Sequence, residues 1–203
     1  MGVKSLTSEA QPFASMSQSD RFVCAGLDGA WRSATFSGVD QLFANLIGLR
    51  GSPRSLFIPK HCKSLPEQIV NEFRSLSRVT FASGSVLKRI GSSAFSRCSQ
   101  LREIEIPASV EEIGEGCFSH TSLSGVTFAS GSVLKLIGKE AFMKCKDLRE
   151  IEIPASVEEI GEGCFSQSSL SRVTFAGGSV LKRIGKYAFR GCRIEEVDIP
   201  RVG

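Results

Sequence analysis

The sequence predicts an α/β solenoid in which short parallel strands form one curved sheet and short helical or 3-10 turns form the opposite side. A 47-residue block runs from Leu76 to Ser122 and recurs from Leu123 to Ser169 with 37 of the 47 positions identical. The block begins a third time at Leu170. It also divides into two coils, of 25 and 22 residues, with matching apolar positions. Self-similarity at a fixed period indicates supersecondary units that stack on one another.

Each coil opens with an alternation of apolar and polar residues that is typical of a short strand. In the 22-residue coil, Leu101, Ile104 and Ile106 alternate with polar residues, and Pro107 follows them. Alternate side chains of a strand point to opposite faces, so the apolar set is predicted to face the core. A proline has no N–H to continue a ladder, and it therefore ends the strand. The 25-residue coil has a turn-rich Ala-Ser-Gly-Ser sequence, residues 82–85, at the same corner.

After the corner, one glycine and one phenylalanine recur in every coil. The glycines are Gly91, Gly114, Gly138, Gly161 and Gly185. The phenylalanines are Phe95, Phe118, Phe142, Phe165 and Phe189. We expect each glycine to mark a position that a β-carbon would crowd, and the phenylalanines to stack as a spine. Burying one such ring contributes about 1.5–3 kcal/mol, so several coils are needed to offset the conformational entropy.

The repeated pattern resembles that of a known family. Residues 101–118 match L-x-x-I-x-I-P-x-S-V-x-x-I-G-x-x-A/C-F almost completely, and five successive coils follow the pattern over residues 76–200. It resembles the BspA-type leucine-rich repeat, and coils of about 20–29 residues suit that repeat class. The resemblance implies a non-enzymatic, surface-antigen-like protein of the cell surface or the secreted fraction. Such a protein would serve adhesion or recognition and bind a protein or glycan through its strand face.

The chain is predicted to have three parts. Residues 1–20 are polar, lack an apolar period and are expected to be disordered. Residues 21–75 are interpreted as degenerate, more helical coils that cap the stack, although regular convex-side helices are the alternative. They contain one helical pattern at 39–47 and a second, Ile69, Val70, Phe73 and Leu76, after Pro66.

The third part, residues 76–203, forms the solenoid of alternating coils with an open C-terminal end. An uncapped last coil would leave an apolar edge exposed. We therefore expect either end-to-end self-association of the chain or an incomplete copy of something longer.

Composition argues against several classes of function. The net charge of +4 is mild, the basic residues are dispersed, and the single Tyr and single Trp offer no stacking platform, so nucleic acid is not expected as a partner. No apolar run approaches the roughly 20 residues of a transmembrane helix. The N-terminus lacks the apolar segment of a secretory signal. The cytoplasm is therefore the alternative to a surface location, with the chain acting there as an interaction scaffold.

The cysteines and glutamate pairs are explained by the repetition. Cys98, Cys145 and Cys192 are 47 residues apart, as are Cys117 and Cys164. We interpret them as buried thiols, with disulfides between neighbouring coils as the alternative. No metal-ligand spacing, phosphate loop or catalytic triad occurs, so no cofactor and no enzymatic activity are predicted. The repeated pairs at 111–112 and 158–159 are expected to be solvated carboxylates.

The outward side of the strands is the remaining candidate for function. Coils of one type place hydroxyls and an occasional arginine there, and coils of the other type place carboxylates. The candidate binding face consists of Arg78, Thr80, Arg102, Glu103, Glu105, Thr127, Arg149, Glu150, Glu152, Arg172, Thr174, Glu196 and Asp198. These residues either keep a parallel sheet soluble, with lateral pairs such as Arg78/Glu103 and Arg172/Glu150, or form a docking groove for a basic ligand. A repeat fragment without independent activity is a further alternative.

Overall fold

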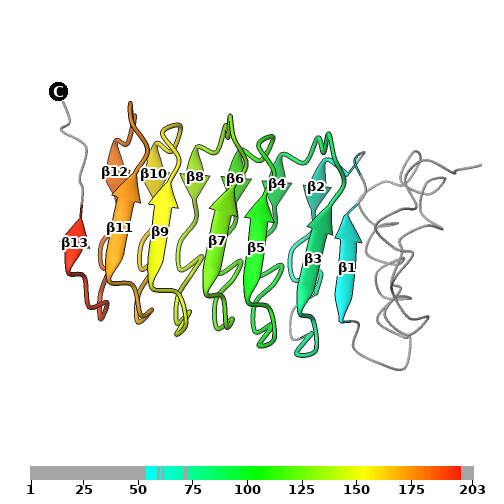
Figure 1. The fold of residues 1–203 in the computed structure, drawn as a ribbon, viewed down its shortest axis with the longest axis horizontal. Helices are drawn as coiled ribbons and strands as arrows, with labels where there is room; N and C mark the ends of the chain where they lie inside the picture. The colour runs from blue at the N-terminus through cyan, green and yellow to red at the C-terminus, as the bar shows by residue number, and fades with distance from the viewer. Residues whose placement is uncertain (1–53, 59, 61, 71–72, 198–203) are drawn as a thin grey trace, which may run out of the picture.

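The alternating apolar pattern folds as a solenoid of short parallel strands. The computed structural model describes residues 54–58, 60, 62–70 and 73–197. Figure 1 shows two rows of strands along the stack, a front row of longer strands and a rear row of shorter strands. The front row consists of β1 (Ser55–Ile58), β3 (Arg78–Phe81), β5 (Glu103–Ile106), β7 (Gly125–Phe128), β9 (Glu150–Ile153), β11 (Arg172–Phe175) and β13 (Glu196–Val197). The rear row consists of β2 (Ser64–Leu65), β4 (Arg89–Ile90), β6 (Glu112–Ile113), β8 (Leu136–Ile137), β10 (Glu159–Ile160) and β12 (Arg183–Ile184).

The strands form more than the one curved sheet predicted from the sequence. The rear row is a continuous six-stranded parallel sheet in the order β12-β10-β8-β6-β4-β2. The front row is divided into three ladders, β1-β3, β5-β7 and β9-β11-β13. The junctions between β3 and β5 and between β7 and β9 therefore lack ladder bonds, and we call them the front seams. Both seams follow a 25-residue coil.

The corner prolines remove one hydrogen bond at each seam. At the β1-β3, β5-β7 and β9-β11 junctions the residue after the second strand donates to the previous coil, as Ala129 N does to Ile106 O at 3.0 Å. At the seams the equivalent residue is Pro107 or Pro154, which has no N–H to donate. The β11-β13 junction is paired although its corner in the sequence is Pro200, so the proline accounts for the loss of this one bond and not by itself for a seam. A serine hydroxyl bridges the coils there instead, because Ser156 Oγ donates to Leu134 O at 2.8 Å.

Each coil has a third side, which follows the rear strand. The prediction of helical or 3-10 turns on this side is wrong. Within the described residues this side consists of hydrogen-bonded turns, and no helix is present. Ser93 and Arg97 have φ angles of 53° and 61°, and such left-handed residues interrupt a right-handed helix. Their N–H groups bond across coils, as Ser93 N does to Glu115 O at 2.7 Å. The backbone bonds therefore connect neighbouring coils along the stack.

The predicted helix after Pro66 is also wrong for the residues that the structure describes. This segment forms turns, and Gln68 has a φ of 54°. Val70 N donates to Ala94 O of the next coil at 3.0 Å, in place of a bond along a helix. The helical pattern at 39–47 and the polar tail at 1–20 lie outside the described residues.

The predicted phenylalanine spine is confirmed. The four consecutive ring pairs from Phe95 to Phe189 have centroids 5.3–5.4 Å apart and interplanar angles of 2–13°. Phe118, Phe142 and Phe165 are completely buried. Stacked rings bury large apolar areas, so the spine contributes a core contact between each pair of neighbouring coils from Phe95 to Phe189.

Candidate binding face

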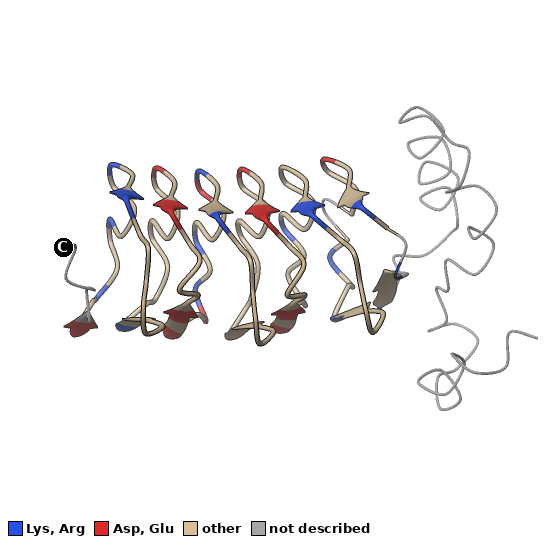
Figure 2. Ribbon diagram, turned by 90° about the horizontal axis from the view of Figure 1, so that it is seen from above, with Lys and Arg blue, Asp and Glu red and all other residues tan. Residues whose placement is uncertain are grey.

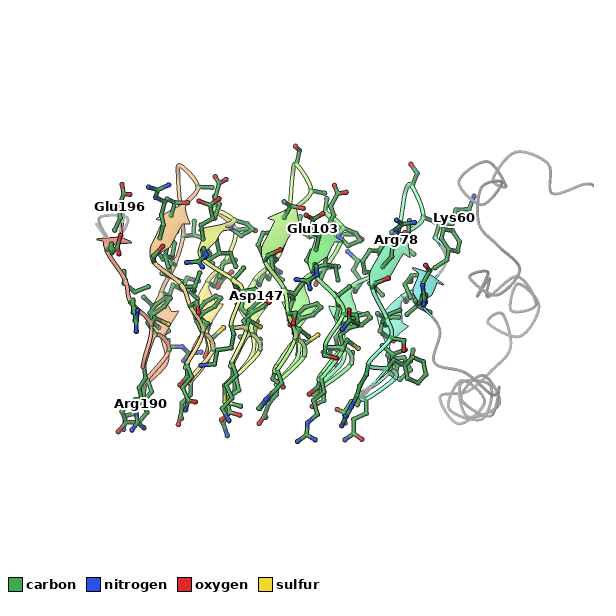
Figure 3. All side chains as sticks on the ribbon, turned by 60° about the horizontal axis from the view of Figure 1, so that its bottom comes forward. Lys60, Arg78, Glu103, Asp147, Arg190 and Glu196 are labelled. Atoms are coloured by element: carbon green, nitrogen blue, oxygen red, sulfur yellow. The ribbon has the colours of Figure 1, made fainter. Side chains whose placement is uncertain are left out.

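The front strands place most of the predicted face in one exposed layer. Arg78, Thr80, Arg102, Glu103, Glu105, Thr127, Arg149, Glu150, Glu152, Arg172 and Glu196 are exposed, and Thr174 is half-buried. Asp198 lies outside the described residues. Figure 3 labels Arg78 and Glu103 on neighbouring front strands and Glu196 on the last strand of the row. The structure thus brings these side chains together on one side of the solenoid.

Acidic residues dominate the middle of the face. Both β5 and β9 have the sequence Glu-Ile-Glu-Ile, in which the isoleucines are buried and the glutamates are exposed. Among the described residues, no ion pair involves Glu103, Glu105 or Glu152. Glu150 has one cationic partner, Arg172, whose Nη1 lies 3.7 Å from Glu150 Oε2. Exposed pairs of this kind stabilise a fold little, so the carboxylates remain accessible to a cation in solution.

The two lateral ion pairs expected from the sequence have different outcomes. Arg172 bridges two strands, because it also donates through Nε to Glu196 Oε2 at 2.8 Å. In the described part of the chain, no ion pair joins Arg78 to Glu103. Those two residues lie on either side of the first front seam, whereas Arg172 is in register with both Glu150 and Glu196 within one ladder.

The second front seam carries a groove. It has a volume of about 450 Å³ and extends from β7 and the loop after it to the end of β9. Thr127, Phe128 and Ser132 line one side, and Glu152 and Ser156 line the other. The sequence signal for this groove is the proline at the corner of every second coil. The strand pattern alone does not indicate that the junction beside this proline lacks ladder bonds.

The rear sheet carries a second charged surface that the face prediction did not include. Along this sheet β4 and β12 are basic, and between them the acidic β6 and β10 lie on either side of the uncharged β8 (Figure 2). Lys88 Nζ lies 2.8 Å from Glu111 Oε1, and Arg89 Nη2 lies 2.9 Å from Glu112 Oε2. The same arrangement recurs where Lys182 and Arg183 pair with the glutamates at 158 and 159.

Lysine partners change the acidity of these rear carboxylates. The hydrogen bond and charge of Lys88 lower the pKa of Glu111, and those of Lys182 lower the pKa of Glu158. The repeated glutamate pairs are therefore solvent-exposed partners of neighbouring cations. Their charges are compensated within the sheet, whereas Glu103, Glu105 and Glu152 of the front face have no ion-pair partner among the described residues.

The described cysteines form no disulfide. Cys98, Cys117, Cys145 and Cys164 are buried thiols, and Cys192 is half-buried. Burial raises the pKa of Cys98 to about 12 and that of Cys145 to about 11. Such thiols are poor nucleophiles, because the thiolate is the reactive form. No three His, Cys, Asp or Glu side chains of the described residues are grouped so as to hold a metal ion.

The described part of the chain contains no helix with the length and apolar character needed to cross a membrane.

Solved structures similar to the chain are repeat proteins from bacteria. The pneumococcal vaccine antigen PcpA is 25% identical with a TM-score of 0.61, and the match covers 73% of this chain and 51% of that protein. A leucine-rich cell surface protein from Faecalibacterium prausnitzii is 28% identical with a TM-score of 0.59, covering 71% of this chain and 38% of that protein. The chain thus spans about half, or less, of the length of these two proteins.

The fold is also similar to that of a leucine-rich repeat protein from T. pallidum. It is 23% identical with a TM-score of 0.55, and the match covers 72% of this chain and 80% of that one. A comparison with curated proteins finds no match. The sequence profile of the BspA type leucine rich repeat region matches residues 40–136 and 135–202, with six copies. The chain belongs to the BspA-type leucine-rich repeat family.

Proposed function

We propose that the chain is a non-enzymatic recognition protein that binds a basic segment of a protein partner on its front face. One observation carries this proposal: Glu103, Glu105 and Glu152 are exposed on the central front strands and have no ion-pair partner among the described residues. Rear glutamates in the same coils are compensated by lysine or arginine. Carboxylates without an ion-pair partner attract and orient a basic partner, even though Arg102 and Arg149 lie on the same face.

A protein is favoured over a glycan as the ligand. The exposed large apolar side chains of the described residues include only one aromatic, Tyr187, which lies on the turn side of its coil. Aromatic rings have the apolar faces on which sugars stack, and the described front face lacks an exposed one. Carboxylates in rows on a regular sheet instead suit the lysine and arginine side chains of an extended basic segment.

The test compares two variants with the same change in charge. In the first, Glu103, Glu105, Glu150 and Glu152 are replaced by Gln; in the second, the rear glutamates Glu111, Glu112, Glu158 and Glu159 are replaced. Binding of a labelled octa-arginine peptide is measured at low ionic strength. We expect the front variant to lose at least about tenfold in affinity and the rear variant to lose much less. Equal losses, or no loss from the front variant, would exclude the front face as the binding surface.

The cell surface is the proposed location. It is supported by the similarity to the Faecalibacterium protein, which is a leucine-rich cell surface protein. An intracellular scaffold is the competing function, because thiols that remain reduced are typical of cytosolic proteins. Labelling of intact cells with a membrane-impermeant amine reagent distinguishes them, since protection of the chain would contradict a surface location.

End-to-end self-association stays a prediction. In the last described coil Ile184 is 44% exposed, whereas the equivalent Ile160 is completely buried. An apolar residue of this kind favours contact with another surface. Light scattering of the 203-residue chain across concentration tests the prediction, and a constant monomer mass would contradict it.

A further inference from the structure

The middle repeat lacks an arginine that the repeats before and after it have. Arg78 and Arg172 begin β3 and β11, and Gly125 occupies the equivalent position at the start of β7. Arg78 lies beside the first front seam and has no ion pair with Glu103 in the described part of the chain, whereas Arg172, within a closed ladder, shows how this face holds a guanidinium. Its Nε lies 2.8 Å from Glu196 Oε2 on one side, and its Nη1 lies 3.7 Å from Glu150 Oε2 on the other.

Carboxylates flank Gly125 in the same order, with no cation between them. Glu103 is in register with Gly125 as Glu150 is with Arg172, and Glu150 itself lies on the strand after Gly125. A β-carbon added to Gly125 would lie 3.5 Å from Glu103 Cγ, which is an ordinary contact. The position therefore has room for a side chain but carries none.

The second front seam opens this position to a side chain from another molecule. Arg172 lies within a closed ladder, in hydrogen-bond register with the strands on both sides. β7 is paired with β5 only, and β9 is paired with β11 only, so the space between β7 and β9 is not closed by ladder bonds. The groove of about 450 Å³ begins beside it, at Thr127 and Glu152, which lie two residues further along the two strands.

We propose that Gly125 marks a guanidinium subsite, in which an arginine of a partner protein binds between Glu103 and Glu150. The inference rests on the proposed function. It adds the type of partner side chain, an arginine, and the place on the front face where that side chain binds. The guanidinium takes the position that Arg172 occupies in the following repeat, and the partner's chain beside it lies in the groove against Thr127 and Glu152. Arginine suits the site better than lysine, because its planar fork donates to two carboxylates at once.

The chain offers its own variants for the test. Gly125→Arg fills the subsite with the arginine of the other repeats, and Arg172→Gly empties the equivalent position between Glu150 and Glu196. Gly177→Arg is the control for added charge, because Gly177 has no neighbouring atom within 4 Å of an added β-carbon. The probes are a fluorescein-labelled Gly-Gly-Arg-Gly-Gly peptide and its uncharged citrulline counterpart, measured by anisotropy at low ionic strength.

We expect the original chain to bind the arginine peptide about tenfold more tightly than the citrulline peptide. Gly125→Arg should remove this preference, and Gly177→Arg should keep it. Arg172→Gly should leave the number of arginine-peptide sites at one, because the position that it empties lies within a closed ladder; a second site would show that the seam is not required. Melting temperatures of all variants are measured alongside, so that unfolding is recognised and not taken for loss of a site.

Failure of the subsite is distinguishable from failure of the proposed face. If arginine preference persists in Gly125→Arg while the variant with the four front glutamates changed to Gln has lost octa-arginine binding, the subsite is wrong and the acidic face stands. If the original chain shows no preference for arginine over citrulline, the subsite is overturned. If octa-arginine binding survives the four front substitutions, the proposed function itself is overturned.

Discussion

At the residue scale, the repeated glycine is a position where the backbones of neighbouring coils lie too close together for a β-carbon. A β-carbon added to Gly161 would lie 2.4 Å from Lys139 N and 2.5 Å from Gly138 C. Atoms of the backbone cannot move aside as the end of a flexible side chain does. The added carbon would therefore push two coils apart along this side of the stack.

Gly161→Ala tests this close approach. We expect it to lower the free energy of unfolding by about 3 kcal/mol, because inserting atoms into a closely packed region forces backbone shifts. The measurement is urea unfolding followed by circular dichroism. Gly177→Ala is the matched control, since an added β-carbon there meets nothing within 4 Å, and its effect should stay within about 0.5 kcal/mol. Equal stability of the two variants would contradict the steric role of Gly161.

The role of this glycine was predictable from the sequence, and the outcome of each lateral ion pair was not. Steric crowding at Gly161 repeats with the coil, so periodicity reveals it. Arg172 forms the expected ion pair with Glu150. Within the described residues Arg78 forms none with Glu103, although the two arginines occupy the same position of the repeat. The difference depends on whether a seam separates the two strands, and a side-chain column contains no information about that.

At the element scale, the strands and the spine were predicted and the turn side was not. Alternation of Leu101, Ile104 and Ile106 specifies a strand because side chains on a strand have a period of two. The turn side has apolar residues at spacings that also suit a helix. Left-handed residues such as Ser93 and His120, with φ of 53° and 59°, are incompatible with a continuous right-handed helix. Serine and histidine have no side-chain feature from which this backbone conformation could be predicted.

The phenylalanine spine makes a prediction about position in the stack. Phe142 is completely buried and has a stacked ring on either side, whereas Phe189 is partly buried and has one stacked neighbour, Phe165. We expect Phe142→Ala to cost about 3–5 kcal/mol in free energy of unfolding, because it leaves a cavity within the core. Phe189→Ala should cost clearly less. The two are compared by chemical unfolding.

A larger loss from Phe189→Ala would show that the stack is not most tightly packed in its middle coils. Phe142→Leu serves as the control for ring removal at constant burial. It should recover part of the stability lost in Phe142→Ala, since the leucine fills some of the cavity.

At the scale of the whole molecule, the described solenoid has two charged surfaces around one core that contains thiols. The rear sheet pairs its glutamates with lysine and arginine, and the front face has three glutamates without an ion-pair partner among the described residues. The core thiols instead connect stability with pH. Cys117 and Cys164 are completely buried, and burial raises the pKa of each thiol well above its ordinary value of 9.0.

Whether stability rises or falls with pH depends on the pH at which the folded chain and the unfolded chain each lose their thiol protons. Below about pH 9 the thiols are protonated in both the folded and the unfolded chain, and the stabilisation is fully present. Above pH 9 the unfolded chain ionises first, while Cys98 keeps its proton up to its pKa of about 12. The unfolded state then binds fewer protons, so the free energy of unfolding falls as the pH rises.

We therefore predict an alkaline loss of stability, approaching about 1.4 kcal/mol per pH unit for each buried thiol. Urea unfolding under reducing conditions from pH 7 to pH 10.5 measures the slope. Cys117→Ala and Cys164→Ala are suitable variants, because Ala94 and Ala141 occupy the equivalent position before the phenylalanine in other coils. Each variant should make the slope shallower by about that amount, whatever it does to stability at pH 7. An unchanged alkaline slope in the double variant would show that groups other than these thiols control the loss, and that the thiol column is accessible to water.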